Sequence, residues 1–359
     1  MESKKEVVVL ENVTKRFGNV IAVSNLSLKI RKGQFVSLLG PSGCGKTTTL
    51  RMISGFEEPS EGSIYIDGKN MVGVPSYRRP TNMCFQNLAL FPHMSVFENI
   101  AYSLKLRKIN SKVIEEKVRR ILFLLDLSGL ENRGINEISG GQAQRVALAR
   151  ALISEPTVLL LDEPLGSLDR KLRVHMRVEL RKIQRRLGIT FLYVTHDQEE
   201  ALVMSDKIVI VNEGKKIQEG SPIEVYNNPQ TKFVADFIGG TNLIEGMVSD
   251  NEEVISSGNL RILAYFKQKI AKNRKVFISI RPEKIKIVKG SNKAVPENYF
   301  RGKVKEVIFL GSSIRYMVVV GENLLLDVLE NVADISKIYA QGDEINLWWK
   351  KEDSVIISE

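Results

Sequence analysis

The stretch Gly40-Pro-Ser-Gly-Cys-Gly-Lys-Thr-Thr48 decides the fold of this chain. Its spacing, a glycine, four residues and then Gly-Lys-Thr, is that of a phosphate-binding loop. An apolar run at 35–39 leads into it and a helix-forming run at 49–53 follows it. Glycines let the backbone turn its N–H groups inward, and the positive end of the following helix attracts anions. The sequence therefore predicts a strand, a phosphate loop and a helix.

The residue types in this loop indicate a nucleotide with a bound cation. Lys46 would bring a full charge to the outer phosphates, and the hydroxyl of Thr47 can coordinate Mg²⁺. The alternative, a glycine-rich turn with a chance lysine, is disfavoured by the acidic residues described below. The whole loop is the candidate nucleotide-binding segment: Gly40, Pro41, Ser42, Gly43, Cys44, Gly45, Lys46, Thr47 and Thr48.

Length and composition are those of a globular protein with two domains. The chain has 359 residues, of which 43% are hydrophobic and 26% charged. No apolar run reaches the ~18 residues of a membrane span, and the N-terminus lacks the apolar core of a signal peptide. The two cysteines, Cys44 and Cys84, indicate no disulfide framework. We expect a cytoplasmic protein.

The net charge of +10 has three interpretations. Nucleic acid and an anionic membrane surface are two of them. The basic residues, however, are scattered along helical faces such as 170–186 and alternate with apolar positions. Solvated helix faces beside a nucleotide site are the favoured interpretation, membrane proximity comes second, and we expect no nucleic acid.

A second motif places acids at a strand end. The wholly apolar run 158–161 is followed by Asp162 and Glu163, which is typical of a buried parallel strand with carboxylates at its carboxyl edge. The phosphate loop emerges at the same edge, so Asp162 could hold Mg²⁺ through water and Glu163 could polarise an attacking water. His196 follows another strand-like run and would share this edge; a structural role is its alternative.

Three further segments carry weaker signals. Ser139 and two glycines precede an Ala/Leu/Arg-rich helix, which would form a second anion-binding helix end. Phe17 lies in a turn between two strands, where packing and adenine stacking are equally open interpretations. Residues 87–100 combine large apolar side chains with Pro92 and polar positions, so this segment is either core or a surface for docking a partner.

The composition changes after Gly240. Before it, strands and amphipathic helices alternate, as in an α/β fold. After it, short strands are expected without a long helix, at 276–280, 304–310, 314–320, 324–329 and 345–349. We expect an α/β nucleotide-binding domain at 1–240 and an all-β, OB-like barrel domain at 241–359.

The motifs taken together resemble the ATPase subunit of ABC transporters. The resemblance covers roughly residues 6–240 and rests on motifs in one order: the phosphate loop, Gln86, Ser139–Gln142, Asp162–Glu163, Leu168–Asp169 and His196. The module after residue 240 resembles the C-terminal regulatory barrel of ABC import ATPases, through the runs 237–246 and 280–283. Segments 89–99 and 187–201 look most like importer ATPases for polyamines (spermidine/putrescine).

This resemblance implies a role for each motif in binding and hydrolysing ATP. Glu163 would be the catalytic base, His196 would contact the γ-phosphate, and Gln86 would sense the metal and the attacking water. Mg²⁺ would be held by Thr47, Gln86 and Asp162. The remaining nucleotide contacts would come from Phe17 at the adenine and, in the site of a second copy, from Ser139, Gly140, Gly141, Gln142 and the interface residue Asp169.

The resemblance also implies partners. Two copies would form a homodimer around two ATP molecules, and membrane permease subunits would dock near residues 87–104. An extracytoplasmic solute-binding protein would belong to the same system, with this chain peripheral on the cytoplasmic face of the membrane. Two residues depart from the family pattern: Ala143 stands where Gln is common, and Gly166 where Ser is common.

Competing functions remain open at this stage. The solute could instead be a sugar, iron(III) or a phosphonate-type compound. A soluble ABC ATPase acting on nucleic acid or ribosomes is disfavoured, because only 99 positions without heptads separate Gly40 from Ser139 and one cassette is present. A non-catalytic regulator is disfavoured by the intact Glu163 and His196.

Overall fold

The computed structural model describes residues 5–166, 168–249, 253–256, 259–266, 270–288, 297–334 and 338–358. Its contacts divide the chain into two compact units, Met1–Pro222 and Ile223–Glu359. None of the helices in these described ranges is both long and apolar enough to cross a membrane.

The first unit is built on a six-stranded sheet in the order β10-β9-β3-β8-β7-β6. All neighbours pair in parallel except β10, which runs antiparallel to β9. Strands β3 and β8 are buried along their whole length, as expected for apolar strands covered on both faces. The bounds are β3 Phe35–Leu39, β6 Thr81–Cys84, β7 Val158–Asp162, β8 Thr190–Thr195, β9 Lys207–Asn212 and β10 Lys215–Gly220.

Alternate residues of the central strands enter two different cores, because successive side chains of a strand point to opposite faces. Leu159 and Leu161 of β7, with Tyr193 of β8, join a core made with the helices. Their sequence neighbours Leu160 of β7 and Leu192 of β8 join a core on the other face of the sheet. The uninterrupted apolar runs of the sequence therefore reflect a sheet with two buried faces.

A four-stranded antiparallel sheet, in the order β2-β1-β4-β5, contributes to the second core. Helix α1 (Lys46–Ser54) joins it there through Leu50, Met52 and Ile53, all fully buried. The strands are β1 Glu6–Phe17, β2 Val20–Arg31, β4 Glu61–Ile66 and β5 Lys69–Asn70.

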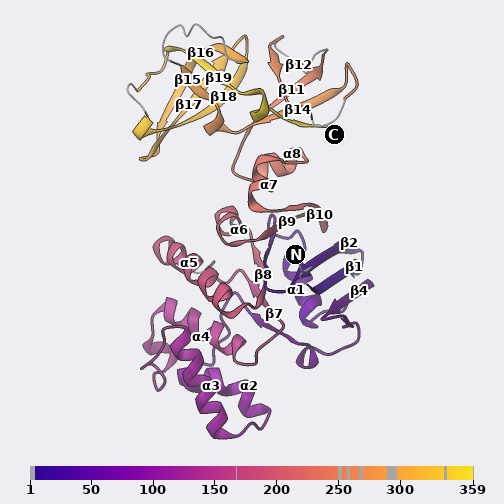
Figure 1. The fold of residues 1–359 in the computed structure, drawn as a ribbon, viewed down its shortest axis with the longest axis vertical. Helices are drawn as coiled ribbons and strands as arrows, with labels where there is room; N and C mark the ends of the chain where they lie inside the picture. The colour runs from indigo at the N-terminus through magenta and orange to yellow at the C-terminus, as the bar shows by residue number, and fades with distance from the viewer. Residues whose placement is uncertain are drawn as a thin grey trace. The chain divides into compact units, whose positions relative to one another are not determined.

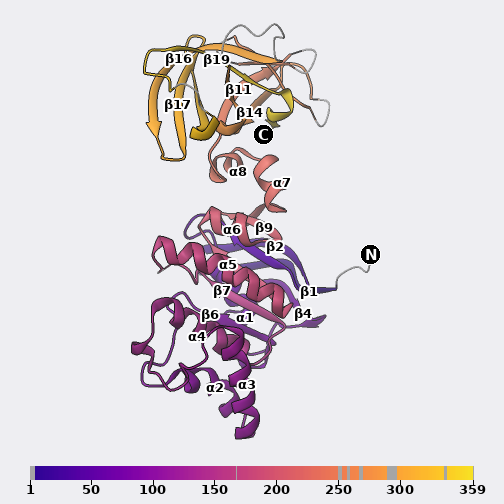
Figure 2. The same cartoon turned by 60° about the vertical axis from the view of Figure 1, so that its left-hand side comes forward.

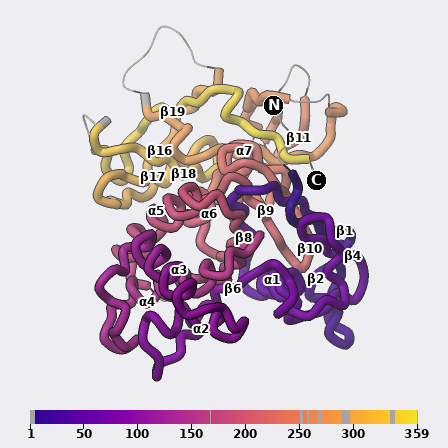
Figure 3. Tube along the Cα trace, turned by 60° about the horizontal axis from the view of Figure 1, so that its bottom comes forward, coloured from indigo at the N-terminus to yellow at the C-terminus, as the bar shows by residue number. Residues whose placement is uncertain are grey.

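The helices of the first core group on the side of this unit away from β1, β2 and β4, as Figures 1 and 3 show. A side chain caps the start of each of them, satisfying a backbone N–H that has no partner within the helix. The helices of the unit are α2 Val96–Leu106, α3 Ser111–Leu124, α4 Gly140–Leu152, α5 Arg170–Leu187 and α6 Gln198–Met204, with one-turn 3₁₀ helices at Ser76–Arg78 and Ile135–Glu137.

The second unit contains two five-stranded antiparallel sheets, β13-β12-β11-β14-β20 and β15-β19-β16-β17-β18. Both sheets supply one shared core, in which Trp349 is buried and donates a hydrogen bond to Ser354 Oγ at 2.9 Å. Figure 2 shows β16, β17 and β19 of one sheet beside β11 and β14 of the other. The five strands expected from the sequence in this region are all present.

The bounds in this unit are α7 Pro222–Asn227, α8 Lys232–Phe237, β11 Asn242–Val248, β12 Glu253–Ser256, β13 Arg261–Leu263, β14 Lys275–Ile280, β15 Lys286–Val288, β16 Asn298–Phe309, β17 Ser313–Val320, β18 Leu324–Asn331, β19 Glu344–Trp349 and β20 Val355–Ile357. Short 3₁₀ helices occur at Pro282–Lys284, Val332–Asp334 and Lys351–Asp353.

Residues 223–240 belong to the same compact unit as the β-strands that follow them. The buried guanidinium of Arg281 donates to the carbonyls of Tyr226, Ala235, Ile238 and Gly240, at 2.5–3.1 Å. We call this set of contacts the Arg281 clamp. The predicted domain boundary after Gly240 stays a prediction. The first strand of the β-sheets begins at Asn242, two residues after it.

Candidate nucleotide site

The phosphate loop lies at the carboxyl end of β3 and leads directly into α1. Two of its glycines have no room for a side chain. A Cβ at Gly40 would lie 2.1 Å from the carbonyl oxygen of Val211, and one at Gly45 would lie 2.4 Å from that of Ala22. Gly45 also has a φ of 99°, which other residues rarely adopt. The shape of the loop therefore depends on glycine at both positions.

Lys46 is the first residue of α1 and is only 5% exposed. Its ammonium group lies inside the loop, where it donates to the carbonyls of Gly40 at 2.8 Å and Pro41 at 2.7 Å. In the described part of the chain, no carboxylate forms an ion pair with it. Its third contact is the Cys44 sulfur at 3.8 Å. A buried cation with only these neutral partners, at the positive end of a helix, favours binding of an anion such as phosphate.

Thr47 and Asp162 are brought together from positions 115 residues apart, with Thr47 Oγ1 donating to Asp162 Oδ1 at 3.0 Å. Burial raises the pKa of Asp162, the charge of Glu163 raises it further, and the hydrogen bond from Thr47 opposes both. A nearby cation would reverse this shift. Hard oxygen donors of this kind fit Mg²⁺, which usually completes its octahedron with water and substrate phosphates. Among the described residues, no cluster of three His, Cys, Asp or Glu forms a metal cage.

Glu163 and His196 meet at the same edge, with Glu163 Oε2 3.1 Å from His196 Nδ1. Glu163 has a φ of 44°, an uncommon conformation for a residue other than glycine. Its backbone N–H donates to the carbonyl of Val194 at 3.0 Å, which ties it to the end of β8. Strained residues of this kind concentrate at functional sites. The sequence predicted both side chains at this edge, and in the structure they are also in contact there.

Gln86 follows β6 by two residues, is exposed, and lies near Gly166. A Cβ built on Gly166 would lie 3.8 Å from Gln86 Nε2 and 3.4 Å from the carbonyl oxygen of Glu163. These are ordinary contact distances, so a serine would fit at position 166. The glycine at this position is therefore not required by crowding around it.

The buried polar residues that hold the His196 segment could not be recognised as a network from the sequence. Arg177 of α5, 7% exposed, donates to Asp197 Oδ2 at 2.8 Å. Glu200, 3% exposed, accepts from the hydroxyl of Tyr193 at 2.6 Å. Burial, and after it the charge of Glu200, raises the pKa of Tyr193 well above its usual value. The spacing of Asp197 and Glu200 at the start of α6 was the available signal, since it matches a capping pattern.

Ser139 and Gln142 make hydrogen bonds to each other at the start of α4. Gln142 N donates to Ser139 Oγ at 3.3 Å, and Ser139 N donates to Gln142 Oε1 at 2.8 Å, which is a capping box. A Cβ on Gly140 would meet nothing within 4 Å, whereas one on Gly141 would contact Leu172. In the described residues, no hydrogen bond joins this segment to the phosphate loop of the same chain. Asp169 likewise caps α5, accepting from Leu172 N at 3.0 Å.

Phe17 ends β1 and is 45% exposed. The ammonium of Lys15 lies 4.7 Å from the centre of its ring. This exposure leaves its stacking on adenine as a prediction.

The segment at 87–100, expected to be core or a docking surface, contributes to the core in part. Leu88, Leu90 and Phe97 pack against the helical core. The fully buried Asn99 braces the preceding loop: it accepts from Phe91 N at 2.8 Å and donates to the carbonyls of Phe91 and Met94 at 3.1 and 3.2 Å. The segment is therefore a fixed surface feature anchored from within.

Comparisons with known proteins agree with this geometry. The family profile described as ABC transporter matches residues 23–166, and that of the TOBE domain matches residues 278–357. The spermidine/putrescine import ATP-binding protein PotA of Acetivibrio thermocellus is 48% identical over 341 residues, covering 95% of this chain and 93% of the relative. The chain belongs to the ATP-binding proteins of ABC transporters. The protein of the same name from Rubrobacter xylanophilus is 50% identical over 322 residues, covering 88% of this chain and 84% of the relative.

Solved ABC cassettes share the fold of the ATPase domain. CbiO1 from Clostridium perfringens, described as part of the ABC transporter complex CbiONQ, is 28% identical with a TM-score of 0.58, covering 62% of this chain and 90% of that one. The bacterial ABC cassette MJ0796, described as a dimer, is 32% identical with a TM-score of 0.53, covering 60% of this chain and 98% of that one. A further dimeric MJ0796 structure is described as a post-hydrolysis state bound to ADP and Pi. This ABC protein is thus an ATP-binding ATPase with an OB-like C-terminal domain.

Proposed function

We propose that this ABC ATPase supplies energy to an importer of polyamines, spermidine and putrescine. The observation that carries the proposal is the set of spermidine/putrescine import ATP-binding proteins that match it along most of its length. Eight such relatives are 43–50% identical and cover 88–98% of this chain. Sugar, iron(III) and phosphonate-type solutes remain the alternatives that an uptake experiment must separate.

The side chains at the sheet edge have separate roles in the proposed reaction. Lys46 and the loop N–H groups bind the phosphates. Thr47 and Asp162, with Gln86, would hold Mg²⁺, which supplies charge neutralisation at the phosphates. Glu163 accepts the proton of the attacking water, and His196, in contact with Glu163, orients this carboxylate and contacts the γ-phosphate.

Two copies of the chain would share each ATP. The capping box at Ser139–Gln142 presents the positive end of α4, with the open face of Gly140, as a second anion site. The phosphate loop that this end of α4 would face is the one in the second copy of the chain. Asp169 would lie in the interface and Phe17 would stack on the adenine. The dimeric MJ0796 cassettes support this arrangement by likeness.

The remaining partners follow from the role in transport. Permease subunits would dock at 87–104, where Asn99 fixes the loop, and a solute-binding protein would deliver the polyamine outside. The ATPase would then work as a peripheral subunit on the cytoplasmic face of the membrane, without a nucleic-acid partner.

Uptake of radiolabelled spermidine tests the proposal. Cells in which the chain is replaced by its Glu163→Gln variant should lose most ATP-dependent spermidine and putrescine uptake, while uptake of maltose and iron(III) continues. The matched control is Glu213→Gln, the same substitution at an exposed glutamate that also has a positive φ, of 48°, and it should import normally. Unchanged spermidine uptake with loss of another solute would overturn the assignment.

A further inference from the structure

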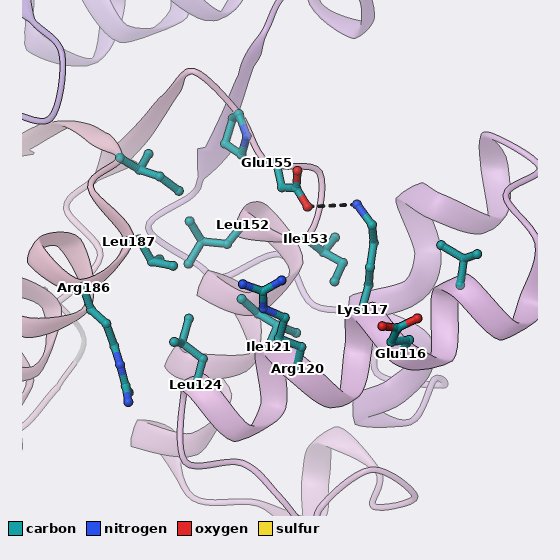
Figure 4. Close-up of a pocket in the computed structure, with 13 residues that line it drawn as sticks. Glu116, Lys117, Arg120, Ile121, Leu124, Leu152, Ile153, Glu155, Arg186 and Leu187 are labelled. Carbon is teal, nitrogen blue, oxygen red and sulfur yellow. Dashed lines mark hydrogen bonds and ion pairs between the residues drawn. The ribbon is translucent and has the colours of Figure 1, made fainter.

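Helix α3 and the carboxyl ends of α4 and α5, all in the first unit, enclose a pocket of about 730 Å³ (Figure 4). One stripe of α3 forms a wall, and the carboxyl ends of α4 and α5 with the segments that follow them complete it. The volume lies within the ~300–1,000 Å³ that is typical of small-molecule sites. None of the roles assigned above to the nucleotide site uses these residues.

The floor of the pocket is aliphatic. Ile121 and Leu124 of α3 face Leu152 and Ile153 at the end of α4, and Leu187 closes the side formed by α5. No lining side chain is aromatic, so a nucleobase or another flat ring would find no stacking partner. A flexible alkyl body matches such a lining better, because it gains from each methylene that it buries.

The charges around the pocket are unequally satisfied. Lys117 pairs with Glu155 at 2.9 Å, so these two neutralise each other. Within the described ranges, the guanidinium groups of Arg120 and Arg186 form neither hydrogen bonds nor ion pairs. Glu116 lies on the far side of Arg120 from Arg186 (Figure 4). Arg120 and Arg186 therefore lie on different sides of Leu124 (Figure 4), and each can pair with an anionic group at its own side of the pocket.

We propose that this pocket binds an anionic amphiphile. A carboxylate or phosphate head accepts hydrogen bonds from Arg120 or from Arg186, whose planar groups suit both anions. An alkyl body of about ten carbons lies on Leu124, Leu152 and Leu187. The same pair of arginines repels polyamine cations, so this site is separate in chemistry from the proposed transport substrate.

The pocket lies at the opposite ends of α4 and α5 from the residues proposed to meet the second copy. Helix α4 begins beside Ser139 and ends at Leu152, and α5 begins beside Asp169 and ends at Leu187. At ~1.5 Å per residue these helices span roughly 20 and 27 Å. The ligand site is thus built from the same two helices as the proposed interface without overlapping it.

Calorimetric titration of the full-length chain with decanoate, below the concentration of micelle formation, tests the proposal. We expect saturable binding of one decanoate, also seen with decyl phosphate, and at least tenfold weaker binding of decyltrimethylammonium. Lengthening the acid from eight to ten carbons should tighten binding by roughly tenfold or more, since each buried methylene contributes ~0.8 kcal/mol. Spermidine should not compete.

Matched variants locate the site. Arg120→Gln with Arg186→Gln should weaken decanoate binding at least tenfold. Arg119→Gln with Arg185→Gln removes the same charge from neighbouring exposed positions outside the pocket and should leave binding unchanged. Equal loss in both pairs, affinity independent of chain length, or binding only to phosphatidylglycerol vesicles would overturn the proposal.

Discussion

At the scale of single residues, Glu163 has the properties expected of the group that activates water. It contacts His196, follows Asp162 and has a strained backbone. We expect Glu163→Gln to lower kcat for ATP hydrolysis by roughly 10²–10⁴-fold, the usual contribution of a positioned base. Steady-state phosphate release measures this, with Glu213→Gln as the control. Near-normal turnover by the Glu163 variant would assign the base to another group.

The second prediction for a single residue concerns how the alkylation rate of Cys44 depends on pH. Burial raises the pKa of its thiol, and the nearby charge of Lys46 opposes this only in part. The neutral thiol therefore dominates at pH 7, and the rate of alkylation by iodoacetamide should rise about tenfold per pH unit up to at least pH 9. MgATP should slow the reaction. Cys84, whose pKa burial raises to about 12, should react more slowly, and Cys44→Ser identifies the signal. A plateau below pH 8 would contradict this prediction.

At the scale of elements, Ser139 caps α4 and is also proposed to contact the ATP bound by the second copy. One substitution can separate these two roles. Aspartate caps a helix about as well as serine, so Ser139→Asp should change the free energy of unfolding by less than about 1 kcal/mol. Its charge would face the triphosphate of the second copy, and like-charge contacts cost several kcal/mol. We expect ATP-driven dimerisation to weaken about 100-fold or more, as measured by sedimentation. Thr231→Asp, at the cap of α8, should leave dimerisation intact. Normal dimerisation of the Ser139 variant would remove this segment from the interface.

The hydrogen bonds of Asn99 to the loop before α2 lead to a prediction about stability. Its replacement by alanine leaves buried backbone groups without partners, each at a cost of roughly 1–3 kcal/mol. We expect Asn99→Ala to lower the free energy of unfolding by about 3 kcal/mol in urea. Lys105→Ala, on the exposed face of the same helix, should change it by less than about 0.5 kcal/mol. A loss below 1 kcal/mol for Asn99→Ala would show that water satisfies these groups.

At the scale of the whole molecule, the Arg281 clamp decides where the second unit can be cut. A fragment starting at residue 223 keeps all four carbonyl partners of Arg281, whereas one starting at 241 loses these hydrogen bonds and exposes the guanidinium to water. We expect the shorter fragment to be less stable by about 3 kcal/mol or more, because hydrogen bonds to a charged group contribute roughly 1.5–3 kcal/mol each. Both tryptophans lie in β19, so their fluorescence reports unfolding of either fragment. Equal stabilities would make 241 the better boundary.

Much of this architecture could be predicted from the sequence because local patterns determined it. The apolar runs before Gly40 and Asp162 and the alternating strands after residue 276 are local signals, and parallel strands bring their carboxyl ends to one edge. The Arg281 clamp and the contact between Arg177 and Asp197 could not be predicted, because they join distant segments through single side chains with no periodicity. The pocket beside Arg120 depends on the side of α3 meeting the carboxyl ends of α4 and α5, which no single motif specifies.

The central claim is that ATP is shared between two copies of this chain. The molar mass of the Glu163→Gln variant, measured by light scattering during size-exclusion chromatography, tests it most directly. We expect a monomer of about 40 kDa without nucleotide, from the 40.4 kDa chain, and a dimer of twice that mass with MgATP. The Ser139→Asp substitution in the same background should keep the protein monomeric. A dimer that forms equally without ATP, or a monomer that persists at saturating ATP, would contradict the claim.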